Sequence, residues 1–349
     1  MNTMRAALFF EPGDVRVQHV EIPSISSDEV LVRVEAALTC GTDLKAFRQG
    51  HRVLLGDHYP APFGHELAGV IETVGANVTG WRPGQRVVAA NSAPCDRCYF
   101  CKRGQNQLCD RLSLLNGAYA EYIRIPASIV RHNLYELPDG LSFEAAALSE
   151  PLACAVHAFE RLNVQSGDQV VILGCGIMGL LFCAVATHHG AKILAVGRDE
   201  EKLAKAREIG VFKTLNVKQE SDPVALVRAH TEEGRGADIV VEAVGKTEAW
   251  DQAFRMTRKG GVVCMFAGCK KGSVFEADAH RIHYEEVTVT GMFHHTPKAF
   301  SKALDYLARG VVKPGMFIAK EIDLDEVGAF YANASSTPFK AVIHPGKKK

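Results

Sequence analysis

Hydrophobic and polar positions follow two different patterns along the chain. From Met4 to about Leu148, short runs of β-type residues such as Val30–Val34 and Arg86–Ala90 are separated by turn residues. After Pro151 the apolar runs are unbroken and alternate with helical segments. The first pattern predicts mostly antiparallel β structure, as a closed or partly open barrel, and the second predicts a parallel sheet covered by helices.

The second pattern has the order of a doubly wound α/β domain. Val170–Leu173 is an apolar run without a polar position, which is typical of a parallel strand buried on both faces. We expect these elements after it: a helix at Met178–His189, a strand at Lys192–Val196, a helix at Glu200–Ile209, and strands at Asp238–Val241, Gly261–Phe266 and Thr288–Gly291. A helix at Pro297–Arg309 and a strand at Lys340–His344 are expected to return to the first domain.

The length of 349 residues is too great for one ordinary core. We expect a catalytic domain over residues 1–153, a nucleotide-binding domain over 154–292, and a segment 293–349 that rejoins the first. The 40 basic and 40 acidic residues balance, which argues against nucleic acid or a membrane surface as the main partner. Because neither a secretory leader nor a membrane span is recognisable, we expect a cytoplasmic protein whose ten cysteines serve as metal ligands and core thiols.

Four cysteines lie in a C-x2-C-x2-C-x7-C run: Cys95, Cys98, Cys101 and Cys109. Thiolates are soft ligands, and four of them can close a tetrahedral shell around Zn²⁺ without leaving a position for chemistry. The spacing therefore predicts a structural zinc in a lobe of about residues 94–110.

A second and sparser ligand set consists of Cys40 and the triplet Gly64-His65-Glu66. A mixed thiolate, imidazole and carboxylate set is typical of a catalytic zinc, which keeps a coordination position for water or substrate. Taken singly, Cys40 would more often be a buried thiol than a ligand, and a Gly-His-Glu triplet occurs by chance. Their joint presence beside the four-cysteine run favours two zinc ions per chain.

The glycine loop Gly174-Cys175-Gly176-Ile177-Met178-Gly179 follows the buried strand and opens a helix. In that context the first glycine makes the turn, the second lets the backbone approach a pyrophosphate, and the third lets helix and strand pack closely. The candidate cofactor-binding residues are Gly174, Gly176, Ile177, Met178, Gly179, Gly197, Arg198 and Lys202.

The choice of nicotinamide depends on the end of the second strand. Gly197 at that end leaves space for a 2′-phosphate, Arg198 can bind it in a bidentate way, and Lys202 can assist. If the strand is two residues longer, Asp199 becomes the acceptor for a ribose 2′-hydroxyl and selects NAD. The sequence favours NADP over NAD.

Together, the stretch Cys40-Gly41-Thr42-Asp43, the residues Gly64–Gly69, the four-cysteine lobe and the glycine loop resemble the zinc-containing medium-chain dehydrogenase/reductase superfamily over essentially the whole chain. The resemblance is to the branch of sorbitol (polyol), threonine, sugar and cyclitol dehydrogenases. It implies an α/β protein with a GroES-like, mostly-β catalytic domain, a Rossmann domain and an active site between them. It also implies a dimer or tetramer that transfers hydride between a small-molecule secondary alcohol and NAD(P).

The resemblance also assigns residues. It implies that Cys40, His65 and Glu66 hold the catalytic zinc, and that Glu150, in a Glu-Pro pair, completes or exchanges into that shell. Because two carboxylates exceed what the ion needs, we expect Glu150 in the second shell. Thr42 is expected to pass the substrate proton outward, although it could instead cap a helix. Lys45 replaces a histidine of threonine-dehydrogenase-like members, which weakens the case for threonine as substrate.

Other interpretations stay open at this point. A simple aliphatic or aromatic alcohol dehydrogenase is compatible with the apolar residues Leu54, Leu55 and Phe293. A nucleotide-binding relic without catalysis would be marked by a lost ligand, and none is lost. His294 and His295 either approach the substrate or belong to an ordinary polar loop. Asp43 is expected to be structural, bonded to backbone or to an arginine.

Overall fold

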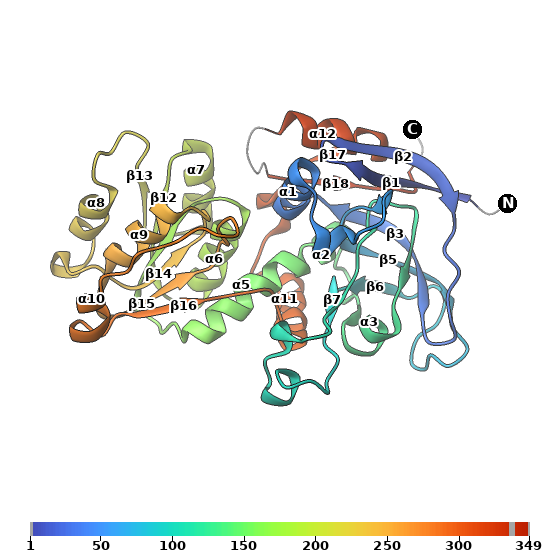
Figure 1. The fold of residues 1–349 in the computed structure, drawn as a ribbon, viewed down its shortest axis with the longest axis horizontal. Coiled ribbons are helices and arrows are strands. Elements are labelled where there is room, and N and C mark those ends of the chain that lie inside the picture. Colours follow the sequence, from blue (N-terminus) through green and yellow to red (C-terminus); the bar gives the residue numbers. More distant parts are fainter. Residues whose placement is uncertain (1–2, 335–338, 348–349) are drawn as a thin grey trace. The chain divides into compact units, whose positions relative to one another are not determined.

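The protein forms two compact units in a computed structural model that describes residues 3–334 and 339–347 (Figure 1). Unit 1 contains residues 1–153 together with 295–349, and unit 2 contains residues 154–294. The chain therefore leaves unit 1, builds unit 2 and returns to unit 1.

Unit 1 is built mainly from β-strands. They are β1 (Thr3–Glu11), β2 (Asp14–Glu21), β3 (Val30–Leu38), β4 (Ala61–Pro62), β5 (Glu66–Val74), β6 (Arg86–Ala89), β7 (Ser92–Ala93), β8 (Ser113–Leu114), β9 (Tyr122–Ile125), β10 (Leu134–Glu136), β17 (Ile318–Ile322) and β18 (Lys340–Ile343). A seven-stranded sheet has the order β10-β6-β5-β3-β18-β17 with β9 also paired to β3, and a three-stranded sheet has the order β2-β1-β4. The pairings are antiparallel except for β17 with β18, which run parallel.

Helices and short 3-10 turns connect these strands. The helices are α1 (Gly41–Gln49), α2 (Arg52–Leu55), α3 (Ala127–His132), α4 (Phe143–Ala147), α5 (Ser149–Leu162), which continues into unit 2, α11 (Pro297–Ala308) and α12 (Val327–Asn333), with 3-10 turns at Pro314–Met316 and Leu324–Glu326. The core of unit 1 is a cluster of fully buried side chains that includes Phe9, Val32, Phe63 and Ile71. Leu55 of α2 belongs to the same cluster.

Unit 2 alternates strands and helices. Its elements are β11 (Gln169–Leu173), α6 (Ile177–His188), β12 (Lys192–Gly197), α7 (Glu200–Ile209), β13 (Lys213–Asn216), α8 (Pro223–Ala229), a 3-10 turn (Glu232–Gly234), β14 (Ala237–Glu242), α9 (Thr247–Met256), β15 (Thr257–Met265), α10 (Ala279–Tyr284) and β16 (Thr288–Gly291). The sheet order is β13-β12-β11-β14-β15-β16 and every pairing is parallel. This order, which reverses between β11 and β14, confirms the predicted Rossmann topology.

The predicted elements differ from the observed ones mainly at their ends. The largest difference is in β15, which begins at Thr257 rather than at Gly261. A register shift in the pairing with β14 accommodates the additional residues, and Gly260 lies in the left-handed region with φ +68°. Such a bulge cannot be read from an apolar run, because the bulged residues are themselves polar or glycine.

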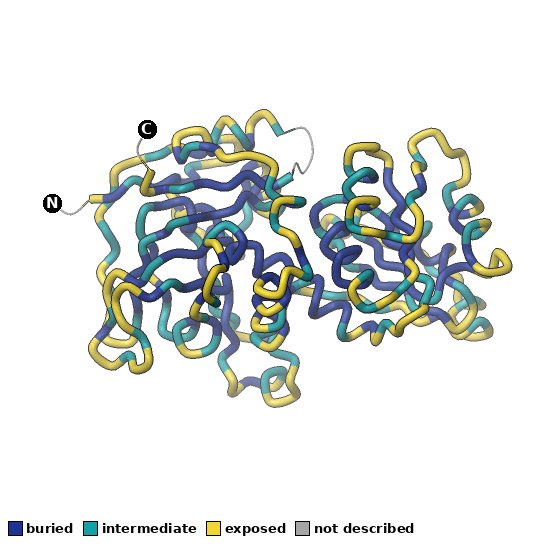
Figure 2. Tube along the Cα trace, turned by 180° about the vertical axis from the view of Figure 1, so that it is seen from behind, coloured by how far each residue is buried: buried dark blue, intermediate teal, exposed yellow. Residues whose placement is uncertain are grey.

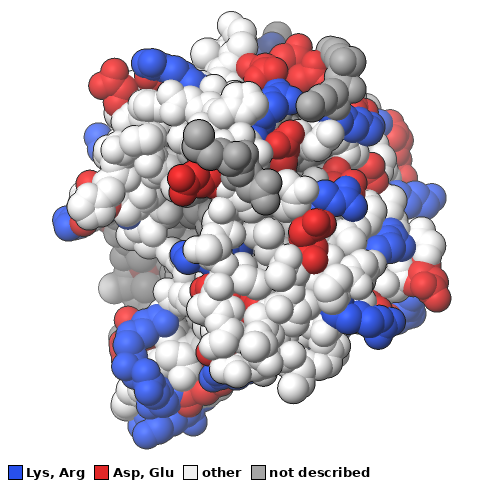
Figure 3. Space-filling view, turned by 90° about the vertical axis from the view of Figure 1, so that its right-hand side faces the viewer, with Lys and Arg blue, Asp and Glu red and all other residues white. Residues whose placement is uncertain are grey.

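Burial follows the strands of each unit, while loops and outer helix faces are exposed (Figure 2). Both acidic and basic side chains occur on the face in Figure 3, around a broad uncharged area at its lower centre. The formal net charge of the whole sequence is zero. None of the helices formed by the described residues combines the length and apolar character needed to cross a membrane.

Candidate active site

The ligand atoms of Cys40, His65 and Glu66 lie within 4.8 Å of one another in unit 1. Cys40 is the N-cap of α1, and its Sγ accepts a hydrogen bond from the backbone N–H of Thr42 at 3.4 Å. Glu66 is the first residue of β5 and His65 directly precedes it, and β5 pairs with β3 just before Cys40. Pairing of these two strands therefore brings together residues that are 25 positions apart in the sequence.

Asp43 holds the imidazole of His65. Its Oδ1 lies 2.9 Å from His65 Nδ1, and the carboxylate is fully buried. Burial lowers the pKa of His65, but the negative Asp43 and Cys40 groups outweigh it and raise the pKa above its ordinary value. A hydrogen bond at Nδ1 leaves Nε2 as the metal-binding nitrogen, which is the arrangement that orients histidine ligands in zinc sites. The expectation that Asp43 bonds backbone or an arginine is thus wrong, because its partner is the histidine itself.

Lys340 of β18 lies behind Glu66. Its Nζ is 2.7 Å and 2.6 Å from the two carboxylate oxygens of Glu66 and 3.0 Å from the carbonyl oxygen of Thr39, so all three of its N–H donors are used. Both side chains are buried. Burial alone lowers the pKa of Lys340, but Glu66 raises it above its ordinary value. Glu66 therefore meets the ligand cluster with part of its charge already balanced.

Glu150 lies outside the group of three. It sits in the first turn of α5, is buried, and has its pKa raised to about 7, chiefly by burial, with His65 opposing the shift. His295, also buried, is 3.0 Å from Asn91 Oδ1 and 3.9 Å from Glu150 Oε1 through its Nε2. His295 thus belongs to the interior of unit 1 rather than to a polar surface loop, whereas His294 is half-buried.

The charges of the cluster suit a divalent cation. With Cys40 ionised and His65 neutral, as zinc ligands have to be, Cys40, Asp43 and Glu66 would carry three negative charges and Lys340 one positive charge. The formal excess of two negative charges is what Zn²⁺ would neutralise, and ligands of this kind lose their protons when the metal binds. Cys40, His65 and Glu66 would hold the ion.

Thr42 and Lys45 are exposed on the first turns of α1. They are three residues apart, so their side chains emerge on the same face of the helix. The alternative in which Thr42 caps the helix is wrong, because the cap is Cys40 and α1 starts at Gly41.

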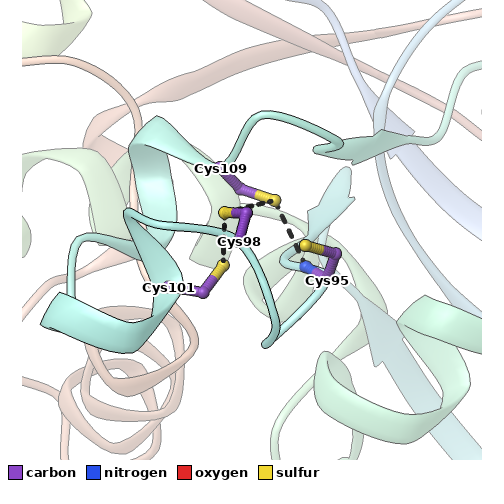
Figure 4. A group of neighbouring side chains, drawn as sticks. All are labelled: Cys95, Cys98, Cys101 and Cys109. Atoms are coloured by element: carbon purple, nitrogen blue, oxygen red, sulfur yellow. Dashed lines mark hydrogen bonds between the residues drawn. The ribbon is translucent and has the colours of Figure 1, made fainter.

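The four lobe cysteines converge on one point (Figure 4). The sulfur of Cys98 is 3.5 Å from that of Cys101 and 3.9 Å from that of Cys109. A tetrahedron with Zn–S bonds of about 2.3 Å requires sulfur separations of about 3.8 Å, which these distances bracket. Two 3-10 turns, Cys101–Arg103 and Asn106–Leu108, carry the chain between the ligands.

Backbone N–H groups donate hydrogen bonds to some of the sulfurs of the lobe. The N–H of Cys95 and the N–H of Arg111 donate to Cys109 Sγ at 3.3 and 3.4 Å. Backbone hydrogen bonding, first of all from Arg97, lowers the pKa of Cys95 to about 6. Burial instead raises the pKa of Cys101 to about 12 and that of Cys109 above its ordinary value, so zinc binding would have to displace the protons of these two thiols.

The glycine loop has the geometry that the motif requires. Gly174 has φ +106°, a conformation that favours glycine, and a Cβ added to Gly179 would lie 1.8 Å from the carbonyl oxygen of Gly174. A Cβ on Gly176 would meet nothing within 4 Å, so the backbone is open where a pyrophosphate would approach the N-terminus of α6. Ile177 and Met178 are the first two residues of that helix.

The end of β12 carries a glycine where an NAD-selecting enzyme would carry an acidic residue. The strand ends at Gly197, and a Cβ there would lie 3.3 Å from Cys175 Sγ. Asp199 is the N-cap of α7 and accepts from the backbone N–H groups of Glu201 and Lys202. Arg198 is exposed, and the structure gives its guanidinium no acidic partner among the described residues.

Sequence reasoning missed Lys340, Tyr119 and Tyr331 and misjudged Asp43. No motif marked Lys340, because a lysine at the start of a strand is ordinarily exposed. The two tyrosines contact Asp43 through their hydroxyl groups, and no motif marked them. Their proximity to the site depends on tertiary packing alone.

Comparison with known proteins identifies the family. Residues 26–139 match the family described as Alcohol dehydrogenase GroES-like domain, and residues 178–309 match Zinc-binding dehydrogenase. Sorbitol dehydrogenase of Halalkalibacterium halodurans is 30% identical over 342 residues, which cover 95% of this chain and 96% of that protein. The chain belongs to the zinc-containing medium-chain alcohol dehydrogenase superfamily. It is thus a zinc-dependent, NAD(P)-dependent dehydrogenase.

Solved structures of the superfamily share the fold over the whole chain. A provisionally named zinc-binding dehydrogenase from Sinorhizobium meliloti 1021, bound to NADP, has a TM-score of 0.90 at 29% identity and covers 99% of this chain and 100% of its own. Alcohol dehydrogenase TADH from Thermus sp. ATN1 has a TM-score of 0.87 at 30% identity and covers 98% of this chain and 99% of its own.

Substitutions at two glycines of the loop distinguish an effect on stability from an effect on cofactor binding. Gly179→Ala forces a methyl group into the Gly174 carbonyl and should cost about 3 kcal/mol of unfolding free energy, the upper end for over-packing. Gly176→Ala should change stability by less than about 1 kcal/mol, because its Cβ has open space. The Gly176→Ala variant should nevertheless bind the dinucleotide more weakly. Urea unfolding measures stability, and fluorescence titration measures affinity for the dinucleotide. Wild-type affinity for the dinucleotide in Gly176→Ala would contradict the assignment of the glycine loop as the pyrophosphate-binding backbone.

The lobe is testable through its metal. Cys98→Ser opens the four-sulfur shell, so zinc content should fall by one ion per chain and stability by more than about 3 kcal/mol. Atomic absorption and thermal unfolding provide the measurements. Cys269→Ser, at a half-buried cysteine outside the cluster, is the control and should keep its full zinc content. An unchanged zinc content in Cys98→Ser would show that the lobe is not a zinc site.

Proposed function

We propose that this enzyme reversibly oxidises a secondary alcohol of the polyol, sugar or cyclitol class and prefers NADP. The observation that carries the proposal is the convergence of Cys40, His65 and Glu66 within 4.8 Å, in a chain that also has an open glycine cradle. Cys40, His65 and Glu66 would bind the zinc, and Glu150 would be the exchangeable carboxylate of the second shell. Glu150 is suited to that role because it is buried nearby without being one of the three converging groups.

Bound zinc would polarise the substrate hydroxyl and lower its pKa, and the nicotinamide would accept the hydride. The residues of the chain have the task of orienting the alcohol and removing its proton. The hydroxyl of Thr42 is exposed two residues after Cys40, where it can accept that proton. From the exposed Thr42 hydroxyl the proton would pass to solvent.

The substrate class follows from the polar character of the ligand set. A carboxylate near the metal and a second one at Glu150 offer acceptors for neighbouring hydroxyl groups of a polyol. Similarity to sorbitol dehydrogenase supports the same class. A simple alcohol is the second candidate, since TADH is an alcohol dehydrogenase of equal identity. The sequence-based case for a simple alcohol relied partly on Leu55 as an apolar residue that would line the substrate site. That case is weaker than expected, because Leu55 lies in the hydrophobic core of unit 1 rather than on a surface.

The preference for NADP rests on three neighbouring residues. Because β12 ends at Gly197, no side chain occupies the position of the hydroxyl-binding acid. Asp199 is engaged as a helix cap, and Lys202 lies 3.7 Å from it. Arg198 is exposed and has no acidic partner in the described part of the chain, so its guanidinium is available for a 2′-phosphate.

We also propose that the enzyme is a homo-oligomer. Strand β16 is the last strand of the unit 2 sheet, and among residues 3–334 and 339–347 it pairs with β15 alone. An edge strand offers unpaired backbone groups to another chain. Exposed apolar side chains occur on and around it: Ile282, Tyr284, Val289 and Phe293. This edge is the surface on which we expect two copies to meet.

Removing the zinc histidine should abolish turnover and leave the fold intact. His65→Ala should lose one zinc per chain and reduce the rate with sorbitol, inositols and simple alcohols by orders of magnitude, because the substrate hydroxyl is no longer activated. Metal analysis and a substrate screen with NADP and NAD provide the measurements.

The matched control for this experiment is His19→Ala, at an exposed histidine of β2. It should retain both zinc ions and wild-type rates. Undiminished turnover in His65→Ala would refute the assignment of the metal site. Wild-type turnover confined to simple primary alcohols would instead favour the second candidate.

Arg198 is expected to recognise the 2′-phosphate. Arg198→Ala should raise KM for NADP roughly 10–100-fold, the equivalent of one charge-assisted hydrogen-bonded pair, and should leave KM for NAD nearly unchanged. Arg207→Ala, at an exposed arginine of the following helix α7 that is paired to Glu200, is the control and should alter neither value. An equal effect of Arg198→Ala on both cofactors would argue that the site does not select NADP.

A further inference from the structure

The buried carboxylate of Asp43 has a second set of partners besides His65. Its Oδ2 accepts a hydrogen bond of 2.6 Å from the hydroxyl of Tyr119, and the hydroxyl of Tyr331 lies 3.3 Å away. Asp43, Tyr119 and Tyr331 are all at most 1% exposed. A carboxylate buried to that extent keeps its charge only when such donors surround it.

The hydrogen bonds form a chain with one direction. The backbone N–H of Cys40 donates to the Tyr331 hydroxyl at 3.3 Å, and the two tyrosine hydroxyls are 2.8 Å apart. Each hydroxyl has a single proton and a choice of acceptors, since Tyr331 can also donate to Asp43 and Tyr119 to the Leu38 carbonyl oxygen at 3.1 Å. We assign the proton of Tyr119 to Asp43, its shortest contact, and the proton of Tyr331 to Tyr119, because the 2.8 Å contact between the two hydroxyls would otherwise lack a proton. Asp43 Oδ1 in turn bonds His65 Nδ1. The chain thus begins at one proposed zinc ligand and ends at the other.

Ring packing fixes the two hydroxyl groups in place. Phe63 meets the rings of Tyr119 and Tyr331 edge-on, each at a centroid distance of 5.7 Å, and Phe47 stacks on Tyr331 at 6.1 Å. Large aromatic side chains packed in this way lose their rotational freedom, so the hydroxyl positions are well defined.

The glycine before His65 makes room for one of these rings. Gly64 has φ +88°, and a Cβ on it would lie 2.7 Å from three ring atoms of Tyr119. The backbone N–H groups of Gly117 and Ala118 bond to the Gly64 carbonyl, and that of Tyr119 bonds to Phe63. The Gly-His-Glu triplet is therefore fitted to the tyrosine as well as to the metal site.

We propose that Tyr119 and Tyr331 are positioning residues, which join Cys40 and His65 through one hydrogen-bonded chain and fix the geometry of the zinc site. The inference rests on the function proposed above for these ligands. Burial raises the pKa of both phenols well above the ordinary value, so they remain donors. Hydrogen bonds in such a chain polarise one another, and the full charge of Asp43 then holds His65 in the tautomer that presents Nε2 to the metal.

The test is the affinity of the catalytic site for metal. Tyr119→Phe and Tyr331→Phe keep the rings and remove the hydroxyls. Each should lower zinc affinity about tenfold, the lower end of what loss of a partner behind a zinc ligand costs. Competition with a chromophoric chelator measures it, and the visible spectrum of the Co²⁺-substituted protein reports the ligand geometry. Because both substitutions interrupt the same chain, the double variant should lose about as much affinity as the worse single variant.

Two controls separate positioning from general stability. Tyr135→Phe removes a half-buried phenol of unit 1 whose hydroxyl bonds Asn133 and Pro297 instead, and it should keep wild-type affinity and spectrum. The lobe zinc of every variant should be retained, which also shows that the variant is folded. Should Tyr119→Phe fail to fold, Tyr331→Phe carries the same test.

The outcomes distinguish this inference from the proposed function. Two metal ions bound with wild-type affinity and an unchanged Co²⁺ spectrum in both single variants would overturn the inference alone. A wild-type protein that binds metal only in its lobe would overturn the proposed function, and the inference with it.

Discussion

Buried negative charge is the constraint around which the site of this enzyme is built. Asp43 and Glu66 are both fully buried, and neither can stay ionised without a partner. Lys340 forms an ion pair with Glu66, while His65 and Tyr119 form hydrogen bonds with Asp43. With Cys40 as a thiolate and His65 neutral, as metal binding requires, a formal excess of two negative charges would remain where the three ligand atoms converge. The interior is thus poised for a divalent cation, and the protein that surrounds it is organised to keep this charge in place.

The need to balance buried charge also explains why the chain returns to unit 1 after building unit 2. Lys340 is 274 residues from Glu66, and Tyr331 is 288 residues from Asp43, so the counter-groups come from the segment that returns after unit 2. Strand β18 enters the sheet beside β3, the strand that leads to Cys40, and so brings the lysine behind the glutamate. The return of the chain therefore completes the site electrostatically as well as extending the sheet. Unit 2, by contrast, needs only its own strand and glycine loop to form the nucleotide cradle.

Local patterns in the sequence predicted what depends on local geometry. The apolar run at Val170–Leu173 and the glycines after it specify a parallel strand and a tight turn, and the cysteine spacing around Cys98 specifies a closed metal shell, so both could be recognised without a structure. The partners of Asp43 could not be recognised, because a lone aspartate in a Cys-Gly-Thr-Asp stretch carries no signal of what will pack on it. Lys340 and Tyr331 were missed for the same reason: their contacts are created by the pairing of distant strands. The cap of α1 was not recognised, and Thr42 was considered as an alternative cap, because a cysteine is an uncommon cap and its sulfur a weak acceptor.

The central claim is that one zinc ion is held by Cys40, His65 and Glu66 and a second by the cysteine lobe. The most direct measurement is an anomalous difference map, recorded at the zinc absorption edge from crystals of the protein grown with NADP. The account predicts two peaks per chain, one central to the four lobe sulfurs and one about 2.3 Å from Cys40 Sγ and about 2.0–2.1 Å from His65 Nε2. A single peak in the lobe, with Lys340 and Glu66 paired beneath an empty Cys40 and His65, would contradict it.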